Sequence, residues 1–295
     1  KFDGETHTML TPGQFTQLTG RAGRRGIDEE GNALICWSPF VPFSEVGELA
    51  ASREFVLRSA FRPTYNMVAN LVATRPQEEA ESLLSRSFGQ FQADRGSGGD
   101  RSLLNAMYAR HAVLEQRGCV EGWELTPKGW PLIRVFNECD LLVSESLAAG
   151  LFEGLSPPDL AAVVSSLTFR RRGPGHSEPP TAETAYGQGI LGVMELAHEL
   201  TAEEQRHGVL ATELPDQGFA ESARRWAEGA EFSEALTDQV SGGEFVRNVR
   251  LVADLLGQLA EIGSPSLFRS AGSARRGLER GVVALTGTLG GVPEE

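Results

Sequence analysis

Cysteine and histidine are scarce in this sequence, and their spacing excludes the common metal sites. The 295 residues include three cysteines, none of them in a Cys-x-x-Cys pair, and five histidines. The histidines lack the His-x-x-x-His and His-Glu-x-x-His spacings that place two zinc ligands on one helix face. A zinc ribbon is therefore excluded, and no bound metal is expected. Isolated cysteines also argue against a disulfide framework and indicate a protein of the reducing cytoplasm.

Lysine and long apolar runs are the other absences. No stretch of 18 apolar residues occurs, so we expect no membrane-spanning helix. Lysine stands only at Lys1 and Lys128, and the 27 basic residues are outnumbered by 40 acidic ones, which gives a formal net charge of −13. This balance excludes nucleic-acid binding through the overall charge and leaves open only a local basic groove.

The apolar residues mostly follow helical spacing, which predicts a mainly α-helical protein. One buried strand is predicted at Ala33–Trp37, behind a glycine-rich turn. From Ser44 onward, apolar residues recur three and four positions apart. Helices are expected at 63–75, 77–92, 102–117, 157–167, 182–207, 217–229, 232–240, 243–262 and 265–280, with a short strand at Cys119–Leu125.

The segment Asp94–Arg101 contains Gly-Ser-Gly-Gly, the composition of a flexible linker, between two helical patterns. It is either a natural surface loop or a junction from which a larger segment has been removed. Residues 102–135 read as helix, strand, turn and a final apolar piece. This order resembles the end of a winged helix.

The densest concentration of chemistry is residues 17–28, which read Gln-Leu-Thr-Gly-Arg-Ala-Gly-Arg-Arg-Gly-Ile-Asp. Three glycines let the backbone turn tightly, and Arg21 and Arg24 project the same way from one helical turn. Arginine suits bidentate contact with phosphate, so this pair is suited to stabilising charge on a transferring γ-phosphoryl group. The alternative is a solvated basic turn, but the full string is far more specific than Gly-Arg-x-Gly-Arg alone.

This string resembles motif six of superfamily-two helicases. In particular, it resembles the DExH branch of superkiller and exosome-assisting RNA helicases and, within that branch, the actinobacterial HelY helicases. The resemblance covers nearly the whole chain in the family's order. It is carried further by residues 1–4 (Lys-Phe-Asp-Gly), 61–67 (Phe-Arg-Pro-Thr-Tyr-Asn-Met), 85–92 (Ser-Arg-Ser-Phe-Gly-Gln-Phe-Gln), 140–145 (Asp-Leu-Leu-Val-Ser-Glu), 226–229 (Trp-Ala-Glu-Gly) and 243–250 (Gly-Glu-Phe-Val-Arg-Asn-Val-Arg).

The resemblance implies a fold of three parts. Residues 1–43 would be the tail of a RecA-like α/β domain, 44–135 a winged helix, and 136–295 a C-terminal helical bundle of the DSHCT type. In the family a long coiled-coil arch leaves the winged helix near residue 95, so the linker at 95–101 is expected to mark a deleted or missing arch. The implied activity is that of an ATP-dependent 3′–5′ RNA helicase, which translocates on single-stranded RNA and unwinds duplexes for RNA processing or decay.

The same resemblance assigns the ATP site. Arg21 and Arg24 would act as arginine fingers, Gln17 would orient one of them or the attacking water, and Gly20 would complete the ATP-binding set. The sequence contains neither Gly-x-x-x-x-Gly-Lys-[Ser/Thr] nor Asp-Glu-x-His, so the phosphate cradle and the acid that holds Mg²⁺ are missing. We therefore expect ATP and Mg²⁺ to serve a longer enzyme and this chain to bind neither alone and to be inactive alone. The start at Lys1, with no initiator methionine or signal peptide, agrees with that expectation.

Residues 243–262 predict an amphipathic helix with two stripes. The apolar stripe steps by four, three, four and three residues, through Phe245, Val249, Val252, Leu256 and Leu259. The polar stripe holds Arg247, Arg250, Asp254, Gln258 and Glu261. Periodicity alone favours an ordinary helix with a solvated face. In the resembling family this is the ratchet helix along the single strand, which implies that nucleic acid is bound by Arg247, Asn248, Arg250 and Asp254.

Weaker signals lie elsewhere. Arg170–Arg172 precede a Gly-Pro loop and are either solvated or in contact with an RNA backbone. The same two interpretations apply to Arg269, Arg275, Arg276 and Arg280. Trp123 and Trp130 flank the turn at 126–129, where packing in the wing is favoured over base stacking.

Two other functions stay open. One is a non-catalytic module that binds nucleic acid or docks a partner, which an ATPase assay would distinguish from a helicase. The other is a DNA-repair helicase of the archaeal ratchet type, which unwinding of matched RNA and DNA duplexes would distinguish. The preferred hypothesis gives single-stranded RNA and ATP as partners, an RNA-decay nuclease as a further candidate, no membrane association and a monomeric state.

Overall fold

The computed structural model describes residues 9–23, 26–39, 41–52, 59–95, 102–171, 180–237 and 240–288. For residues 286–288 only the backbone is described. By its internal contacts the chain divides into two units, Lys1–Ala60 and Phe61–Glu295. The described part is mainly helical, as the sequence predicts. The sequence assigns residues 44–60 to the winged helix, but by internal contacts they fall in the first unit. The helix at the start of this stretch (Phe43–Ala51) packs on the helix at Pro12–Thr19.

The described part of the first unit contains two short helices, α1 (Pro12–Thr19) and α2 (Phe43–Ala51), which contact each other. α1 begins at a capping box: the Thr11 hydroxyl accepts a hydrogen bond from the Gln14 amide, and the Gln14 side chain accepts one from the Thr11 amide. No described residue of this unit is buried. The described residues therefore give it no core of its own.

The predicted buried strand at Ala33–Trp37 is wrong. Residues 31–38 form neither helix nor strand, and Leu34 and Trp37 are 94% and 85% exposed. A strand needs a neighbour to satisfy its backbone hydrogen bonds, and the described part of this unit contains no second strand. An apolar run of strand-like composition is thus left without a partner.

The second unit opens with four helices and a small hairpin. The helices are α3 (Tyr65–Thr74), α4 (Gln77–Ser85), α5 (Phe88–Arg95) and α6 (Leu103–Gln116). Strands β1 (Val120–Glu121) and β2 (Glu124–Leu125) pair antiparallel, and the 3₁₀ helix η2 (Pro131–Arg134) follows them. The hairpin replaces the single strand predicted at 119–125, because the chain turns at Gly122 with a φ of +56°, a conformation that favours glycine.

The single helix predicted at 77–92 is also wrong, because the chain leaves helical geometry at Arg86 and Ser87. The Ser87 hydroxyl accepts a hydrogen bond from the Gln90 amide at 3.2 Å. A serine that satisfies the first free amides of a new helix favours a start at this point over continuation of the old helix. α4 and α5 are therefore separate elements.

Gln90 is a buried polar residue that joins the end of α5 to the start of α6. Its Oε1 atom accepts a hydrogen bond from the Leu103 amide at 2.8 Å, and its Nε2 atom donates one to Asp94 at 2.7 Å. One side chain thus holds both flanks of residues 96–101. Those residues, where the sequence predicts a linker, lie outside the described part of the chain.

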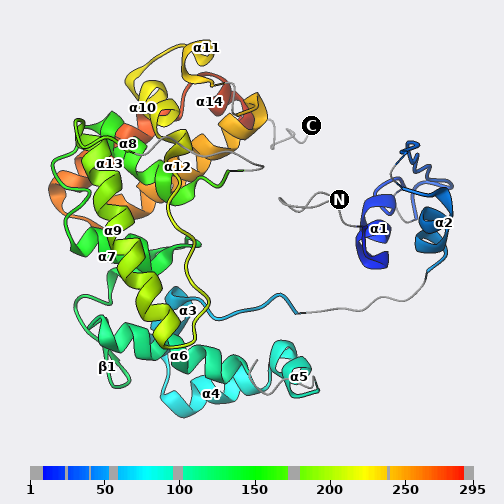
Figure 1. Ribbon diagram of the computed structural model, residues 1–295, viewed down its shortest axis with the longest axis horizontal. Helices are drawn as coiled ribbons and strands as arrows, with labels where there is room; N and C mark the ends of the chain where they lie inside the picture. The colour runs from blue at the N-terminus through cyan, green and yellow to red at the C-terminus, as the bar shows by residue number, and fades with distance from the viewer. Residues whose placement is uncertain are drawn as a thin grey trace. The chain divides into compact units, whose positions relative to one another are not determined.

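The rest of the second unit is a helical bundle. Its elements are α7 (Asp140–Ala148), α8 (Pro157–Thr168), α9 (Ala185–Arg206), η3 (Gln217–Phe219), α10 (Ala220–Glu228), α11 (Phe232–Ala235), α12 (Gly242–Ile262), α13 (Pro265–Leu278) and α14 (Gly281–Thr288). α8 is central: every residue from Leu160 to Leu167 is buried, and α9, α10, α12 and α13 contact it (Figure 1). A helix that is apolar or small on all sides has to be buried in this way.

α9 links the bundle to the first four helices of the unit. It has 22 residues, so it is about 33 Å long. It contacts α8, α7 and α6, and Figure 1 shows it running from the bundle down to α6. The far end of α9 is one of the places where the two halves of the second unit are joined.

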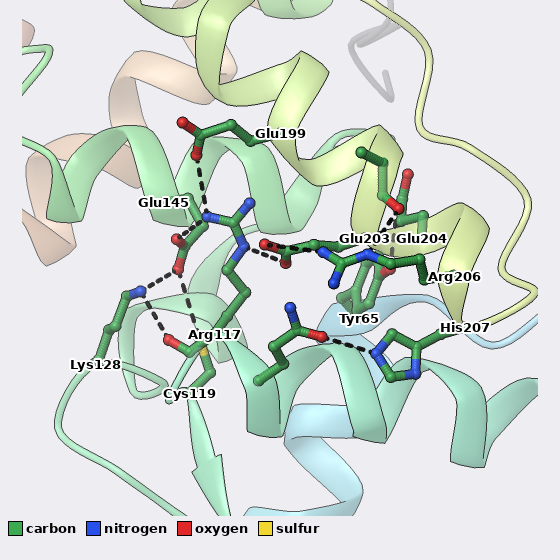
Figure 2. A network of polar contacts seen from close by, with 12 residues as sticks. Tyr65, Arg117, Cys119, Lys128, Glu145, Glu199, Glu203, Glu204, Arg206 and His207 are labelled. Atoms are coloured by element: carbon green, nitrogen blue, oxygen red, sulfur yellow. Dashed lines mark hydrogen bonds and ion pairs between the residues drawn. The ribbon is translucent and has the colours of Figure 1, made fainter.

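A network of buried charges makes that join (Figure 2). Arg117, just after α6, contacts Glu203 of α9 at 2.6 Å and Glu145 of α7 at 3.4 Å. Glu145 also contacts Lys128 at 2.7 Å. Close by, the Tyr65 hydroxyl of α3 donates to the buried Glu204 at 3.0 Å. Buried charges of this kind are tolerated only when paired, so the network fixes how the three helices meet.

Candidate nucleic-acid interface

α12 is built to present one polar face. Ser241 and Glu244 form a capping box at its start. The predicted apolar stripe is confirmed, since all five of its residues are fully buried: Phe245, Val249, Val252, Leu256 and Leu259. The opposite face is exposed at Arg247, Arg250, Leu251, Asp254 and Glu261. At 100° per residue these five positions lie within about 60° of Arg247 around the helix, so they form a single stripe.

The end of α8 is held against the start of α12 by aromatic packing. Phe169, which caps α8, stacks on Phe219 with ring centroids 5.8 Å apart. Phe219 meets Phe245 of α12 edge to face at 5.5 Å. Such pairs stabilise a fixed geometry beyond their burial alone. They place the basic residues after Phe169 beside the first turns of α12.

A polar hollow of about 60 Å³ lies at this junction. It is lined by Phe169, Arg170, Arg171, Val240, Glu244, Arg247 and Asn248. Arg170 and Arg171, which are a weak signal in the sequence, are thus brought next to two of the predicted strand-binding residues. Arg172, the third of that basic run, lies outside the described residues.

The three arginines of the hollow differ in their pairing. Arg170 contacts Glu213 at 2.6 Å, and Arg171 contacts Asp216 at 3.6 Å. Arg247 is exposed, and its side chain makes no hydrogen bond or ion pair with any other described residue. Glu244 also lines the hollow, but no ion pair joins it to Arg247, so Arg247 is the guanidinium of this hollow that is most available to an incoming anion.

Of the other predicted strand-binding residues, one is buried and two make hydrogen bonds within the chain. Asn248 is buried and faces the hollow. Arg250 donates to the main-chain oxygen of Val283 in α14 at 3.2 Å. Asp254 accepts a hydrogen bond from Gln258, one turn further along α12, at 2.9 Å. Arg247 and Arg250, which the sequence assigns to the same strand, thus differ in their surroundings, because Arg250 also ties two helices together.

The residues predicted to act on ATP lie in the first unit. Gln17, on α1, and Gly20 and Arg21, directly after it, are all exposed. Gly20 approaches the preceding turn so closely that a Cβ atom would lie 2.8 Å from the Thr16 carbonyl oxygen, so this position requires glycine. Arg24 lies outside the described residues.

Residues 122–286, more than half of the chain and including α7 to α13 and the hollow, match the family model described as the DSHCT (NUC185) domain. The chain belongs to the DSHCT family. The probable helicase HelY of Mycobacterium tuberculosis is 58% identical over 95 residues, 32% of this chain and 10% of the relative. The DExH-box ATP-dependent RNA helicase DExH11 of Arabidopsis thaliana is 31% identical over 148 residues, 50% of this chain and 11% of the relative.

Human superkiller complex protein 2 is 32% identical over 117 residues, 39% of this chain and 9% of the relative. The predicted resemblance to the DExH helicases and to HelY is confirmed by these matches. The matched parts span about a tenth of the length of these relatives. The DSHCT match begins at Gly122, so the residues predicted to act on ATP lie outside it.

Two ionisable groups at the start of α7, Cys139 and Asp140, are buried and have raised pKa values. Burial raises the pKa of the Cys139 thiol, and this sulfur accepts a hydrogen bond from Arg170 at 2.8 Å. Burial also raises the pKa of Asp140 to about 6, although the amides of Asn66 and Leu141 donate to its carboxylate. Asp140 thus joins α3 to α7 and changes charge in the mildly acidic range.

Sequence reasoning missed three of the seven residues that line the hollow, Phe169, Val240 and Glu244. Val240 and Phe169 line it, but an isolated apolar residue carries no sign of such a role. The only signal for the Arg170 side was the run of three arginines itself. Among the described residues no group of three or more His, Cys, Asp or Glu side chains could hold a metal ion, and no helix is long and apolar enough to cross a membrane.

Proposed function

We propose that this chain is the strand-binding, C-terminal part of an ATP-dependent DExH helicase that moves 3′ to 5′ on single-stranded RNA. The observation that carries the proposal is Arg247, an exposed arginine with no partner among the described residues, at the edge of a hollow lined by two further arginines. The DSHCT match and the names of the relatives, which are helicases, support it.

The strand would bind through its phosphates. A guanidinium offers two parallel N–H donors to a phosphate and stays charged at every physiological pH. Arg170 and Arg171 are held in place by Glu213 and Asp216, which offset much of their charge, so Arg247 would be the main cationic contact to the strand. The overall charge of −13 does not oppose this, because repulsion from distant surface charges is largely screened beyond about 10 Å at physiological salt.

We further propose that the first half of the second unit is the winged helix of such an enzyme. α6, the β1–β2 hairpin and η2 follow one another as in that fold. The hairpin is fixed to α3 because Trp123 donates from its indole nitrogen to the main-chain oxygen of Arg75 at 2.8 Å. This packing also favours the structural role predicted for Trp123 over base stacking.

The first unit would be the tail of a RecA-like domain. Its exposed apolar residues, Leu34 and Trp37 among them, are the kind of surface that the remainder of such a sheet would cover. In that arrangement Arg21 and Arg24 would stabilise charge on ATP and Gln17 would orient the reacting groups. The sequence contains neither Gly-x-x-x-x-Gly-Lys-[Ser/Thr] nor Asp-Glu-x-His, so in that arrangement ATP and Mg²⁺ would be held mainly by residues of a longer enzyme.

Binding to single-stranded oligonucleotides at several salt concentrations tests the strand-binding role. We expect Arg247→Gln to weaken binding of a fluorescent oligouridylate and to reduce the slope of log affinity against log salt by about 0.7, the value for one lost phosphate contact. Arg86→Gln is the matched control, since Arg86 is an exposed arginine between α4 and α5. Equal effects of the two changes would reject the hollow as the binding site.

ATP hydrolysis separates the helicase from a non-catalytic binding module. The missing phosphate-binding loop favours no turnover by these 295 residues alone. In a chain that also carries the phosphate-binding loop and the DExH motif, RNA-stimulated hydrolysis is expected. Comparing oligouridylate with oligodeoxythymidylate as activator then distinguishes an RNA helicase from a DNA-repair helicase.

A further inference from the structure

Phe136 is an exposed aromatic residue on a fixed backbone. Its side chain is 69% exposed, although it lies between the hairpin half of the second unit and α7. Val135 before it is fully buried, and Asn137 after it accepts a hydrogen bond from the Cys139 amide at 2.8 Å. The chain is therefore held on both sides of Phe136, and the ring is presented to solvent by a backbone that does not have to be ordered.

The main chain of Phe136 is bound directly to α12. Its amide donates to Oε1 of Gln258 at 2.7 Å. Nε2 of the same Gln258 donates to Asp254 at 2.9 Å. The hydrogen bonds thus run from Asp254 through Gln258 to Phe136 and attach this residue to the polar face of α12.

This attachment point lies in line with the hollow. Arg247, Leu251, Asp254 and Gln258 are spaced by four, three and four residues, and Gln258 is only about 20° from Arg247 around the helix axis. The two ends of this row are 11 residues, or about 16 Å, apart. Arg247 stands at one end, Phe136 is anchored at the other, and the partly exposed Leu251 lies between them.

From this arrangement we infer that Phe136 is a stacking platform for an unpaired nucleobase of the strand whose phosphate Arg247 holds. The inference rests on the proposed strand-binding function and adds to it a contact to the bases. Single-strand binding surfaces combine cationic contacts to the backbone with aromatic side chains under the bases, and such stacking is tolerant of sequence because every base has a π-face. A ring on an ordered backbone loses little entropy when it stacks.

In this row Asp254 has a role other than the nucleic-acid contact that the sequence predicts for it. Its carboxylate orients the amide of Gln258, whose oxygen is thereby left to accept from Phe136. Asp254 is then a positioning residue for the platform rather than a contact to the strand, as suits a negative charge beside a phosphate backbone.

Four substitutions of Phe136, made in the 295-residue chain, test the platform with a fluorescent oligouridylate. Phe136→Ala and Phe136→Leu should both weaken binding by about 5- to 150-fold, the range for one lost base stack. Phe136→Tyr and Phe136→Trp should bind as the wild type does. Leucine keeps an apolar surface but no π-face, so a leucine variant with wild-type affinity would overturn the inference. Phe268→Ala is the matched control, because Phe268 on α13 is 61% exposed.

Salt dependence and an abasic strand separate this inference from the proposed function. Phe136→Ala should leave the salt slope unchanged, because stacking releases no counterions, whereas Arg247→Gln should reduce it. On an abasic oligonucleotide, Phe136→Ala and wild type should bind equally. If Arg247→Gln weakens binding and Phe136→Ala does not, the platform is rejected and the proposed function stands. If the wild-type chain binds no single strand, both are rejected.

Discussion

Replacing Arg117 tests whether the charge network of Figure 2 holds the second unit together. Arg117 is 11% exposed and contacts Glu203 at 2.6 Å, Glu145 at 3.4 Å and Glu199 at 3.7 Å. Arg117→Met keeps most of the side-chain volume and removes the charge. It leaves two largely buried carboxylates without their main partner, and breaking a buried pair in this way costs about 3–5 kcal/mol.

The structure places the expected loss near the lower end of that range. Nη2 of Arg117 is buried and has no hydrogen-bond partner among the described residues, so the wild type already bears the cost of one unsatisfied donor. Lys128 also remains as a partner of Glu145. We therefore expect Arg117→Met to lower the free energy of unfolding by about 3 kcal/mol, which moves the midpoint of urea unfolding by roughly 1 M.

Arg225→Met is the control that separates the effect of burying an ion pair from the effect of a short distance between its charges. Arg225 contacts Glu221 at 2.7 Å, nearly the same separation as the Arg117–Glu203 pair, but it is 50% exposed. An exposed pair contributes about 0–1 kcal/mol, so this variant should unfold close to the wild type. Circular dichroism at 222 nm during urea titration measures both variants. Equal losses for the two would refute the argument that burial, and not the short distance, gives the network its energy.

Three further outcomes are expected. The pKa of Asp140 is raised from 3.8 to about 6, so the folded state binds the proton of this carboxyl more tightly than the unfolded state does. The stability contributed by the protonated carboxyl is therefore complete below about pH 4 and is lost as the pH rises through 6. The stability of wild type relative to Asp140→Asn should accordingly fall by roughly 3 kcal/mol between pH 4 and pH 7, and a flat difference in urea titrations would contradict the shift. Leu256→Ala should destabilise the chain by about 2–5 kcal/mol because it opens a cavity in the core. Arg247→Gln changes a surface residue and should alter stability by less than about 0.5 kcal/mol. Thermal unfolding of the two variants measures this difference. In a chain with the complete ATP site, Arg24→Ala should reduce hydrolysis about a thousandfold and leave RNA affinity without nucleotide unchanged, so normal ATPase activity in that variant would reject its role as an arginine finger.

The helices that the sequence predicts well are those whose own residues decide both ends and the buried face. α12 is the clearest case, because Ser241 and Glu244 mark its start and the stripe from Phe245 to Leu259 fixes its buried side. The prediction for α8 held for the same reason, with Ser156 as its cap before two prolines. Local pattern is sufficient when one element carries all the information.

Prediction failed where a partner or a competing local bond decides the structure. The apolar residues 33–37 suit a strand, but no second strand is present among the described residues of that unit. The spacing at 77–92 suits one helix, but the Ser87 hydroxyl starts a second one. The hollow joins Arg170 to Arg247 through three phenylalanine rings from different elements. The spacing of apolar residues along the sequence does not reveal contacts between residues this far apart in the chain. The site could therefore be predicted only on its α12 side.

Gln90 has a consequence for the length of the chain between its two flanks. Since its hydrogen bonds to Asp94 and Leu103 fix where the chain leaves α5 and where it enters α6, closing that loop costs mainly conformational entropy. The cost grows only with the logarithm of loop length, so making the connection ten times longer costs about 2 kcal/mol. We therefore expect α5 and α6 to keep their packing when a folded module whose ends lie close together, such as a fluorescent reporter, is inserted between them.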